Sequence, residues 1–183
     1  MPVTRSGGRI GRVSDAPTNL QNPLPQVRRV TTIRAAVEAC QSAKVSGWPM
    51  VTYAQRLICL SMQYSLSNPW DMPAKALRKG RGYCWQQARV LQRVLRRLGI
   101  DCDLVYATRT RVPRHREDGV IVPTHVSAHI WCQVTLDGET RDVDPVDPNG
   151  KYTPLSKTRR WNWMASLISY PRSALASRHR DTQ

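Results

Sequence analysis

Residues 84–99 have the sequence CWQQARVLQRVLRRLG, which is the most regular pattern in the chain. Small and apolar side chains recur along it at steps of four, three, four and three residues, at Cys84, Ala88, Leu91, Leu95 and Leu98. This spacing places them on one face of an α-helix, and Gly99 follows where a left-handed C-cap is expected. Gln86 and the arginines are expected on the other surfaces. The stretch predicts an amphipathic helix that begins at a cysteine and packs on the core.

Strand signals follow this helix. Four segments rich in Val, Ile, Tyr, Trp and Thr cover residues 103–109, 119–123, 127–136 and 139–145. The dipeptide Asp137-Gly138 between the last two is a strong signal for a β-hairpin. The second half of the chain therefore predicts an antiparallel sheet, and 160–170 is compatible with a final helix.

Helices are predicted before residue 84. Residues 31–44 are compatible with one helix, and Thr52 is a suitable N-cap for a second helix over 53–66. Residues 67–82 contain two prolines and two glycines, so we expect a loop there. The order of helices followed by an antiparallel sheet indicates the α+β class.

The composition indicates one basic folded domain with terminal tails. The chain has 183 residues, with 28 Lys and Arg against 13 Asp and Glu, which gives a net charge of +15. We predict a basic disordered arm over 1–29, a folded domain over 30–170 and a disordered basic tail over 171–183. No apolar run is long enough for a membrane span, and the first twenty residues lack the apolar core of a signal peptide, so we expect a cytoplasmic protein.

Cys84 is the strongest candidate nucleophile among the five cysteines. It lies in the first turn of the predicted helix, where free N–H groups and the helix dipole favour a thiolate. Eight cations and no acidic residue lie between Asp71 and Asp101, and their field also favours the thiolate. The alternative is that Cys84 is a small buried side chain of the apolar stripe.

The hairpin brings a histidine close to an aspartate. If Asp137-Gly138 forms a two-residue turn, Leu136 pairs with Glu139 and Trp131 lies opposite Asp144. His129 and Asp144 are then diagonal neighbours on one face, close enough for a hydrogen bond. Asp142 lies one pleat repeat farther away. A thiolate, a histidine and an aspartate supply the nucleophile, base and orienting acid of acyl transfer, although His129 also fits a structural role in the core.

These residues resemble a known family. Gly82-Tyr83-Cys84-Trp85 and the later Leu95–Ile100 are similar to the catalytic-cysteine helix of the transglutaminase-like superfamily. His129–Val134 and Val143-Asp144-Pro145 resemble the histidine and aspartate strands of the same family. The resemblance covers about residues 50–146, with Cys132 and Val146 as departures from the usual pattern.

The resemblance implies a papain-like or transglutaminase-like α+β core with the cysteine helix on an antiparallel sheet. It implies Cys84, His129 and Asp144 as a catalytic triad that forms a thioester with a protein or peptide amide. The acyl group then passes to water or to an amine. The backbone N–H of Cys84 is one expected oxyanion donor, the second is unassigned, and no cofactor is expected.

Three other interpretations are open. Arg81-Gly82-Tyr83-Cys84 also resembles the cysteine motif of arylamine N-acetyltransferases, although the chain is short for that family. The basic tails and the arginines near 109–116 fit a nucleic-acid-binding protein on the same scaffold, for which we expect weak, nonspecific contact with phosphates. His125, His129 and Cys132 lie close in sequence, but strand alternation puts Cys132 on the opposite face, which disfavours a zinc site. The oligomeric state is left open.

Overall fold

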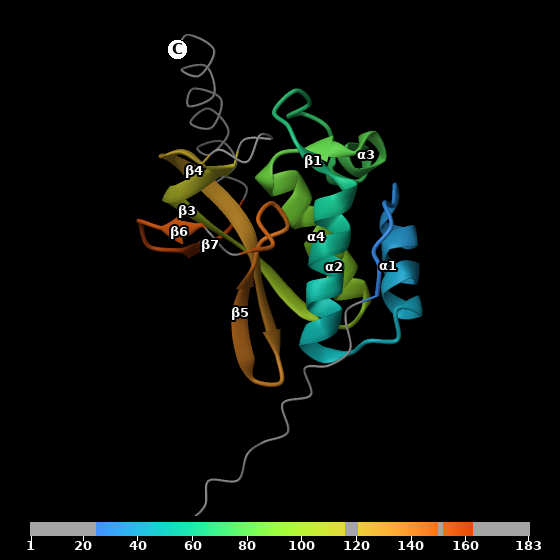
Figure 1. The fold of residues 1–183 in the computed structure, drawn as a ribbon. Helices are drawn as coiled ribbons and strands as arrows, with labels where there is room; N and C mark the ends of the chain where they lie inside the picture. Colours follow the sequence, from blue (N-terminus) through green and yellow to red (C-terminus); the bar gives the residue numbers. More distant parts are fainter. Residues whose placement is uncertain (1–24, 116–120, 150–151, 163–183) are drawn as a thin grey trace, which may run out of the picture.

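The computed structural model describes residues 25–115, 121–149 and 152–162, with the side chains of 112–125 left out. Helices α1 (Ile33–Ser42), α2 (Gly47–Ser61), α3 (Pro73–Lys79) and α4 (Cys84–Arg97) precede the long strands β3 (Asp101–His115) and β4 (Ile121–Leu136) and the shorter β5 (Glu139–Val143). Figure 1 shows these helices gathered on one side of the molecule and the long strands on the other. The predicted α+β class, with the cysteine helix packed on an antiparallel sheet, is confirmed.

Helix α4 lies at the centre of the core, as its periodicity predicts. Cys84, Ala88, Leu91 and Leu95 are buried, Leu98 is half-buried, and Gly99 has the positive φ of a C-cap at 78°. The expectation that Gln86 lies on an outer surface is wrong. Three glutamines of this helix are buried, Gln86, Gln87 and Gln92. Their side-chain amides form hydrogen bonds with backbone groups, which satisfies these polar side chains inside the core.

The N-terminal helices differ from the prediction in their bounds. Helix α1 forms within the predicted range, and the Thr32 hydroxyl caps it by accepting from the Ala35 N–H at 3.1 Å. Thr52 is not an N-cap. It lies inside α2 and donates its hydroxyl to the Trp48 carbonyl, which satisfies the group without ending the helix. Helix α2 ends at Ser61, so the predicted range of 53–66 is too late at both ends.

The segment predicted as a loop contains two short elements. Pro73 is the first residue of α3, where its missing N–H costs nothing, and Gly80 ends that helix in the left-handed conformation at φ 69°. Two of the residues taken as helix breakers are therefore the first residue and the C-cap of this helix. Strand β2 (Arg81–Gly82) follows and pairs in parallel with β1 (Gln63–Tyr64), which holds the start of α4 beside the end of α2.

The antiparallel sheet has the strand order β5-β4-β3-β6, with β6 (Thr153–Pro154) and β7 (Arg159–Arg160) both paired to β3. The segments predicted separately at 119–123 and 127–136 belong to one strand, β4. Residue 160 lies in β7, so the expected helix does not begin there, and 163–170 lie outside the described residues together with the tail at 171–183. Residues 1–24 of the expected arm are also outside, while Val27 packs on the core.

Within the described residues, no helix is long and apolar enough to cross a membrane.

Candidate active site

Cys84 is held at the first turn of α4 by the chain that enters the helix. Gly82 accepts hydrogen bonds at its carbonyl from the Ser65 N–H (3.1 Å) and from the Gln87 amide (2.9 Å). A Cβ at Gly82 would lie only 2.8 Å from the Gln86 side-chain oxygen and 2.9 Å from Met62. A larger residue here would displace the Gln86 and Met62 side chains, so glycine keeps the Gln86 hydrogen bonds in place at the start of α4. Cys84 itself is only 3% exposed.

Gln86 fixes the loop that precedes α3 to the start of α4. Its Oε1 accepts from the Tyr83 N–H at 3.0 Å, and its Nε2 donates to the carbonyls of Asn68 (2.9 Å) and Asp71 (2.7 Å). Asp71 in turn pairs with Lys75 and Lys79 of the α3 region. The first turn of α4 is therefore anchored on a network that spans the preceding twenty residues.

The hairpin places His129 and Asp144 as the register count predicts. Leu136 pairs with Glu139 and Cys132 with Val143, and the positive φ values of Asp137 (52°) and Gly138 (78°) match a type I′ turn. His129 Nε2 lies 2.5 Å from Asp144 Oδ2. The structure thus brings these two predicted residues into direct contact.

Asp144 is fixed by two further contacts. Its Oδ1 accepts from the Val146 N–H at 2.9 Å, and its carbonyl accepts from the Gln55 amide of α2 at 2.9 Å. Asp142, the rejected alternative, instead lies 3.3 Å from the Gln133 amide on the exposed part of the hairpin. The orienting contact to the imidazole therefore belongs to Asp144.

His129 is buried and its ring orientation is fixed by aromatic neighbours. The Tyr152 ring stacks on it at 4.2 Å with an interplanar angle of 6°, and Trp131 lies 5.8 Å away. Burial of the imidazole opposes its charged form, but the Asp144 carboxylate and then the Cys84 sulfur favour it and raise the pKa of His129 to about 10. Asp144 bonds directly to this ring, and the influence of Cys84 on its pKa shows that the sulfur lies close to it. Cys84, His129 and Asp144 are thus brought together at one place.

Comparison with protein families identifies the family of the chain. Residues 30–155, more than half of the chain, match the Transglutaminase-like superfamily. The chain belongs to the transglutaminase-like superfamily. No curated protein matches the sequence.

Solved structures with similar folds include transglutaminase-like proteins. One is a transglutaminase with 15% identity and a TM-score of 0.46, covering 72% of this chain and 34% of that chain. Another is the ethylmercury-bound periplasmic domain of TgpA from Pseudomonas aeruginosa, with 19% identity and a TM-score of 0.46, covering 64% and 44%. A third, from Cytophaga hutchinsonii and assigned as a candidate cysteine protease, has 12% identity and a TM-score of 0.43, covering 75% and 51%. This transglutaminase-like chain spans about a third to a half of their lengths.

The other cysteines of this transglutaminase-like chain lie in the core or on helix α2. Cys40, Cys102 and Cys132 are buried in the core, and Cys59 is half-buried on α2. Cys132, the departure from the family pattern, donates its thiol to the Ala88 carbonyl of α4 at 3.2 Å. It therefore faces the helix, where its polar group is satisfied. Burial raises the pKa of the Cys132 thiol well above its usual range and that of Cys40 to about 11.

Two tyrosines at the site were missed by sequence reasoning. Tyr64 is in β1 opposite Gly82, and Tyr152 begins the described range 152–162. Burial, with the nearby negative charge of Asp144, raises the pKa of the half-buried Tyr152 phenol, whereas Tyr64 is 46% exposed. Tyr64 falls in the helix predicted over 53–66 and Tyr152 in no predicted element, so no sequence signal indicated that either lies at the site.

The described residues contain no group of three or more His, Cys, Asp or Glu side chains that could hold a metal. The side chain of His125, one member of the disfavoured zinc set, lies outside the described residues.

Proposed function

We propose that this protein is a cysteine-dependent acyl-transfer enzyme that attacks an amide bond of a protein or peptide with Cys84. The observation that carries the proposal is the buried imidazole of His129, which binds Asp144 and whose charged form the nearby Cys84 sulfur favours. A thiol, a base and an orienting carboxylate in this order are the parts that nucleophilic acyl transfer needs. Membership of the transglutaminase-like superfamily, a family of cysteine-dependent enzymes, supports the same reaction class.

In the first half-reaction the Cys84 thiolate attacks the amide carbonyl carbon and forms a tetrahedral oxyanion. The backbone N–H of Cys84 lies in the first turn of α4, where it has no partner within the helix and is suited to stabilise that oxyanion. His129, held as an imidazolium by Asp144, then donates a proton to the leaving amine. The C–N bond breaks and a thioester on Cys84 remains.

In the second half-reaction His129 is neutral and acts as a base. It takes a proton from water or from an incoming amine, which attacks the thioester carbonyl and displaces the Cys84 thiolate. Water gives hydrolysis, and an amine gives transfer. The choice between them, the substrate and the cytoplasmic location expected from the sequence stay predictions.

Selective alkylation tests the proposed nucleophile. We expect iodoacetamide to modify Cys84 at least about tenfold faster than any other cysteine, as measured by mass spectrometry of peptides from the full chain. Cys59 is the internal control, because it is the most exposed of the five cysteines while burial and the charges of Asp144 and Asp147 raise its pKa.

A second measurement separates nucleophilicity from simple access. His129→Asn should slow alkylation of Cys84 by about tenfold or more while leaving the rate at Cys59 within about twofold. Preferential labelling of Cys59 in the wild type, or an unchanged Cys84 rate in His129→Asn, would contradict the proposed function.

A further inference from the structure

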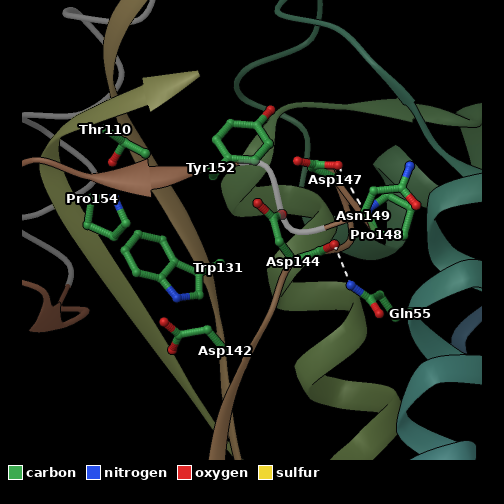
Figure 2. A pocket seen from close by; sticks show the side chains of 10 residues that line it. All are labelled: Gln55, Thr110, Trp131, Asp142, Asp144, Asp147, Pro148, Asn149, Tyr152 and Pro154. Atoms are coloured by element: carbon green, nitrogen blue, oxygen red, sulfur yellow. Dashed lines mark hydrogen bonds between the residues drawn. The ribbon is translucent and has the colours of Figure 1, made fainter. Parts of the chain in front are cut away.

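A cavity of about 390 Å³ lies where α3 ends and β2 begins, apart from the candidate active site. This α3–β2 cavity is lined by Arg29, Leu60, Gln63, Lys79, Gly80 and Arg81. The cavity that Figure 2 shows has Asp144 and Tyr152 in its wall and therefore belongs to the site around His129. The two cavities share no described lining residue, so the mechanism proposed above makes no use of the α3–β2 cavity.

The charged residues in the wall of this cavity are all basic. Arg29, Lys79 and Arg81 are among its described lining residues, whereas no aspartate or glutamate is. The Lys79 ammonium binds Asp71 at 2.6 Å, but Asp71 also binds Lys75 at 2.8 Å. These two ammonium groups hold the pKa of the Asp71 carboxyl well below its usual range. One carboxylate is thus shared by two lysines, and both arginines are left without an acidic partner among the described residues.

The guanidinium groups of Arg29 and Arg81 are available to a ligand. Neither group forms a hydrogen bond or an ion pair with another residue in the described part of the chain. Both residues are exposed, so an acceptor can reach their donors from the solvent. Each guanidinium presents five N–H donors in a planar fork that matches the oxygens of a phosphate or a carboxylate. The cavity therefore offers two open forks to an anion.

The backbone that carries these arginines is fixed by the fold. Next to Arg29, the Val30 N–H donates to the Ser61 hydroxyl of α2 at 3.0 Å. The Arg29 guanidinium lies against Gly80, where a Cβ would be only 1.5 Å from its Nη2 atom, so the absence of a side chain at Gly80 leaves room for it. Arg81 is in β2, which is held by its parallel pairing with β1. Because the backbone is already ordered, binding an anion here costs little additional ordering.

Charge and shape indicate which anion fits. A phosphate monoester carries a charge of about −1.5 to −2 at neutral pH and has three terminal oxygens. The two unpaired guanidiniums have a combined charge of about +2 and can bind those oxygens with two forks. A carboxylate has one charge and two oxygens, so it occupies one fork and leaves the other unpaired. Leu60 is the only large apolar residue among the described lining residues, so the anion itself is the group that is recognised.

We propose that the α3–β2 cavity binds the phosphate group of a phosphate monoester. Arg29 and Arg81 donate to its terminal oxygens, and Lys79 adds a third positive charge to the wall. The bound phosphate joins the segment before α1 to β2, the strand that leads into α4 at Cys84. This site goes beyond acyl transfer, because no step of that reaction involves its residues. A phosphorylated side chain and a small phosphate ester present the same group, and binding measurements distinguish these two sources.

Binding of inorganic phosphate tests the site. The measurement is isothermal titration calorimetry of the full chain at constant ionic strength and neutral pH, with acetate as the comparison anion. We expect phosphate to bind about tenfold or more tightly than acetate, because only phosphate engages both arginines. Arg29→Gln and Arg81→Gln should each weaken phosphate binding by about tenfold or more, since each removes charged hydrogen bonds to the anion.

A matched pair of double variants separates this site from the net charge of the protein. Arg29→Gln with Arg81→Gln removes two cations from the cavity, and Arg97→Gln with Arg109→Gln removes two exposed cations from α4 and β3. The control pair should bind phosphate within about twofold of the wild type, and both pairs should unfold at the wild-type urea midpoint, since all four side chains are exposed. Equal losses in the two pairs, or phosphate binding no tighter than acetate in the wild type, overturn the proposal.

Two further ligands distinguish the sources of the phosphate. One is the peptide acetyl-glycyl-phosphoserine-glycinamide, and the other is glycerol 3-phosphate. Tighter binding of the peptide assigns the site to a phosphorylated protein, and tighter binding of glycerol 3-phosphate assigns it to a small phosphate ester. In either case the affinity should fall when Arg29 and Arg81 are both replaced by glutamine and should persist in the control pair. An affinity for both ligands that is unchanged in the cavity pair contradicts the proposal.

Discussion

Asp144 joins three parts of the structure through its side chain and its carbonyl. One carboxylate oxygen binds His129, the other binds the Val146 N–H, and the backbone carbonyl accepts from Gln55 on α2. Because both carboxylate oxygens are occupied, the carboxylate cannot rotate without breaking a bond. Its orientation therefore fixes the tautomer and the plane of the imidazole.

Replacing Asp144 with asparagine tests this role. We expect Asp144→Asn to lower the rate of thioester formation by about 10² to 10⁴, because the amide group no longer stabilises the imidazolium or holds the correct tautomer; the range follows the serine-protease example of such a substitution. The measurement is the second-order rate of Cys84 modification by an amide-derived electrophile. Asp137→Asn, in the turn of the same hairpin, is the control and should react within about twofold of the wild type.

The pH dependence of stability gives a second readout for Asp144→Asn. The pKa of His129 is raised from 6.5 to about 10, so its protonation stabilises the folded state fully below about pH 6.5, and this contribution is lost as the pH rises toward about 10. In Asp144→Asn burial dominates and lowers the pKa of His129, so this loss between about pH 6.5 and about pH 10 should disappear. Urea unfolding at several pH values measures it. An unchanged pH dependence would show that Asp144 does not set the charge of His129.

The sequence predicted the pairing of His129 with Asp144 because a two-residue turn at Asp137-Gly138 fixes every later pair of the hairpin. It did not predict Gln86, whose partners are the carbonyls of Asn68 and Asp71. Any residue has such carbonyls, so side-chain identities carry no signal for this contact. Tyr152 was missed for a similar reason, since its position against His129 depends on the path of the chain after β5.

At the scale of elements, α4 combines a hydrophobic stripe with amides that bind the backbone of its neighbours. Gln86 binds the loop before α3, Gln87 binds β2 and Gln92 binds the Cys102 carbonyl of β3. The apolar stripe alone would allow α4 to slide or rotate slightly on the sheet. The amides select one position, and that position decides where Cys84 stands relative to His129.

Removing one of these amides should cost stability. We expect Gln86→Ala to lower the free energy of unfolding by about 2 to 3 kcal/mol, because it leaves the Tyr83 N–H and two loop carbonyls without a partner and opens a small cavity. Chemical denaturation in urea measures the loss. Gln63→Ala, an exposed glutamine of β1, is the matched control and should stay within about 0.5 kcal/mol. Equal effects of the two changes would contradict a specific role of the Gln86 network.

Helix α3 was not predicted from the sequence for a physical reason. Pro73 and Gly80 are helix breakers when they lie inside a helix, but here they are its first residue and its C-cap. The helix has seven residues, too few to show a reliable apolar period. The helix forms because Ala76 and Leu77 are buried against α4, which is a tertiary contact. Helix α4 is long enough for its apolar period to be recognised without knowledge of tertiary contacts, and its prediction was correct.

At the scale of the whole molecule, arginines are distributed over both the helices and the sheet. Arg89, Arg93, Arg96 and Arg97 lie on α4, and Arg109 and Arg111 are exposed on β3. Some arginines are paired with acidic side chains, as Arg96 and Arg160 are with Asp103. The excess of positive charge over the whole chain, +15, nevertheless favours contact with an acidic partner.

The basic surface predicts weak nucleic-acid binding whose affinity depends strongly on salt concentration. With 28 cationic side chains, the protein should bind a random 20-base-pair duplex at low ionic strength, and the affinity should fall by about 10² or more between about 50 and 200 mM salt. Arg109→Gln with Arg111→Gln should weaken binding about equally for all duplex sequences and reduce the salt dependence, as measured by fluorescence anisotropy.

Whether binding to nucleic acid persists at physiological salt distinguishes a nucleic-acid-binding function from a surface that is merely basic. Contacts made only to phosphates lose their affinity as counterions compete, whereas contacts to bases or stacked rings do not. Among the described residues, Trp85 and Trp161 lie against each other, Tyr152 stacks on His129, and Arg89 covers the Trp161 ring. These rings are therefore already in contact with other side chains of the protein. We therefore expect no sequence-selective binding at about 150 mM salt. Nanomolar, sequence-selective binding under that condition, retained in Cys84→Ala, would place nucleic acid ahead of amide chemistry as the role of this fold.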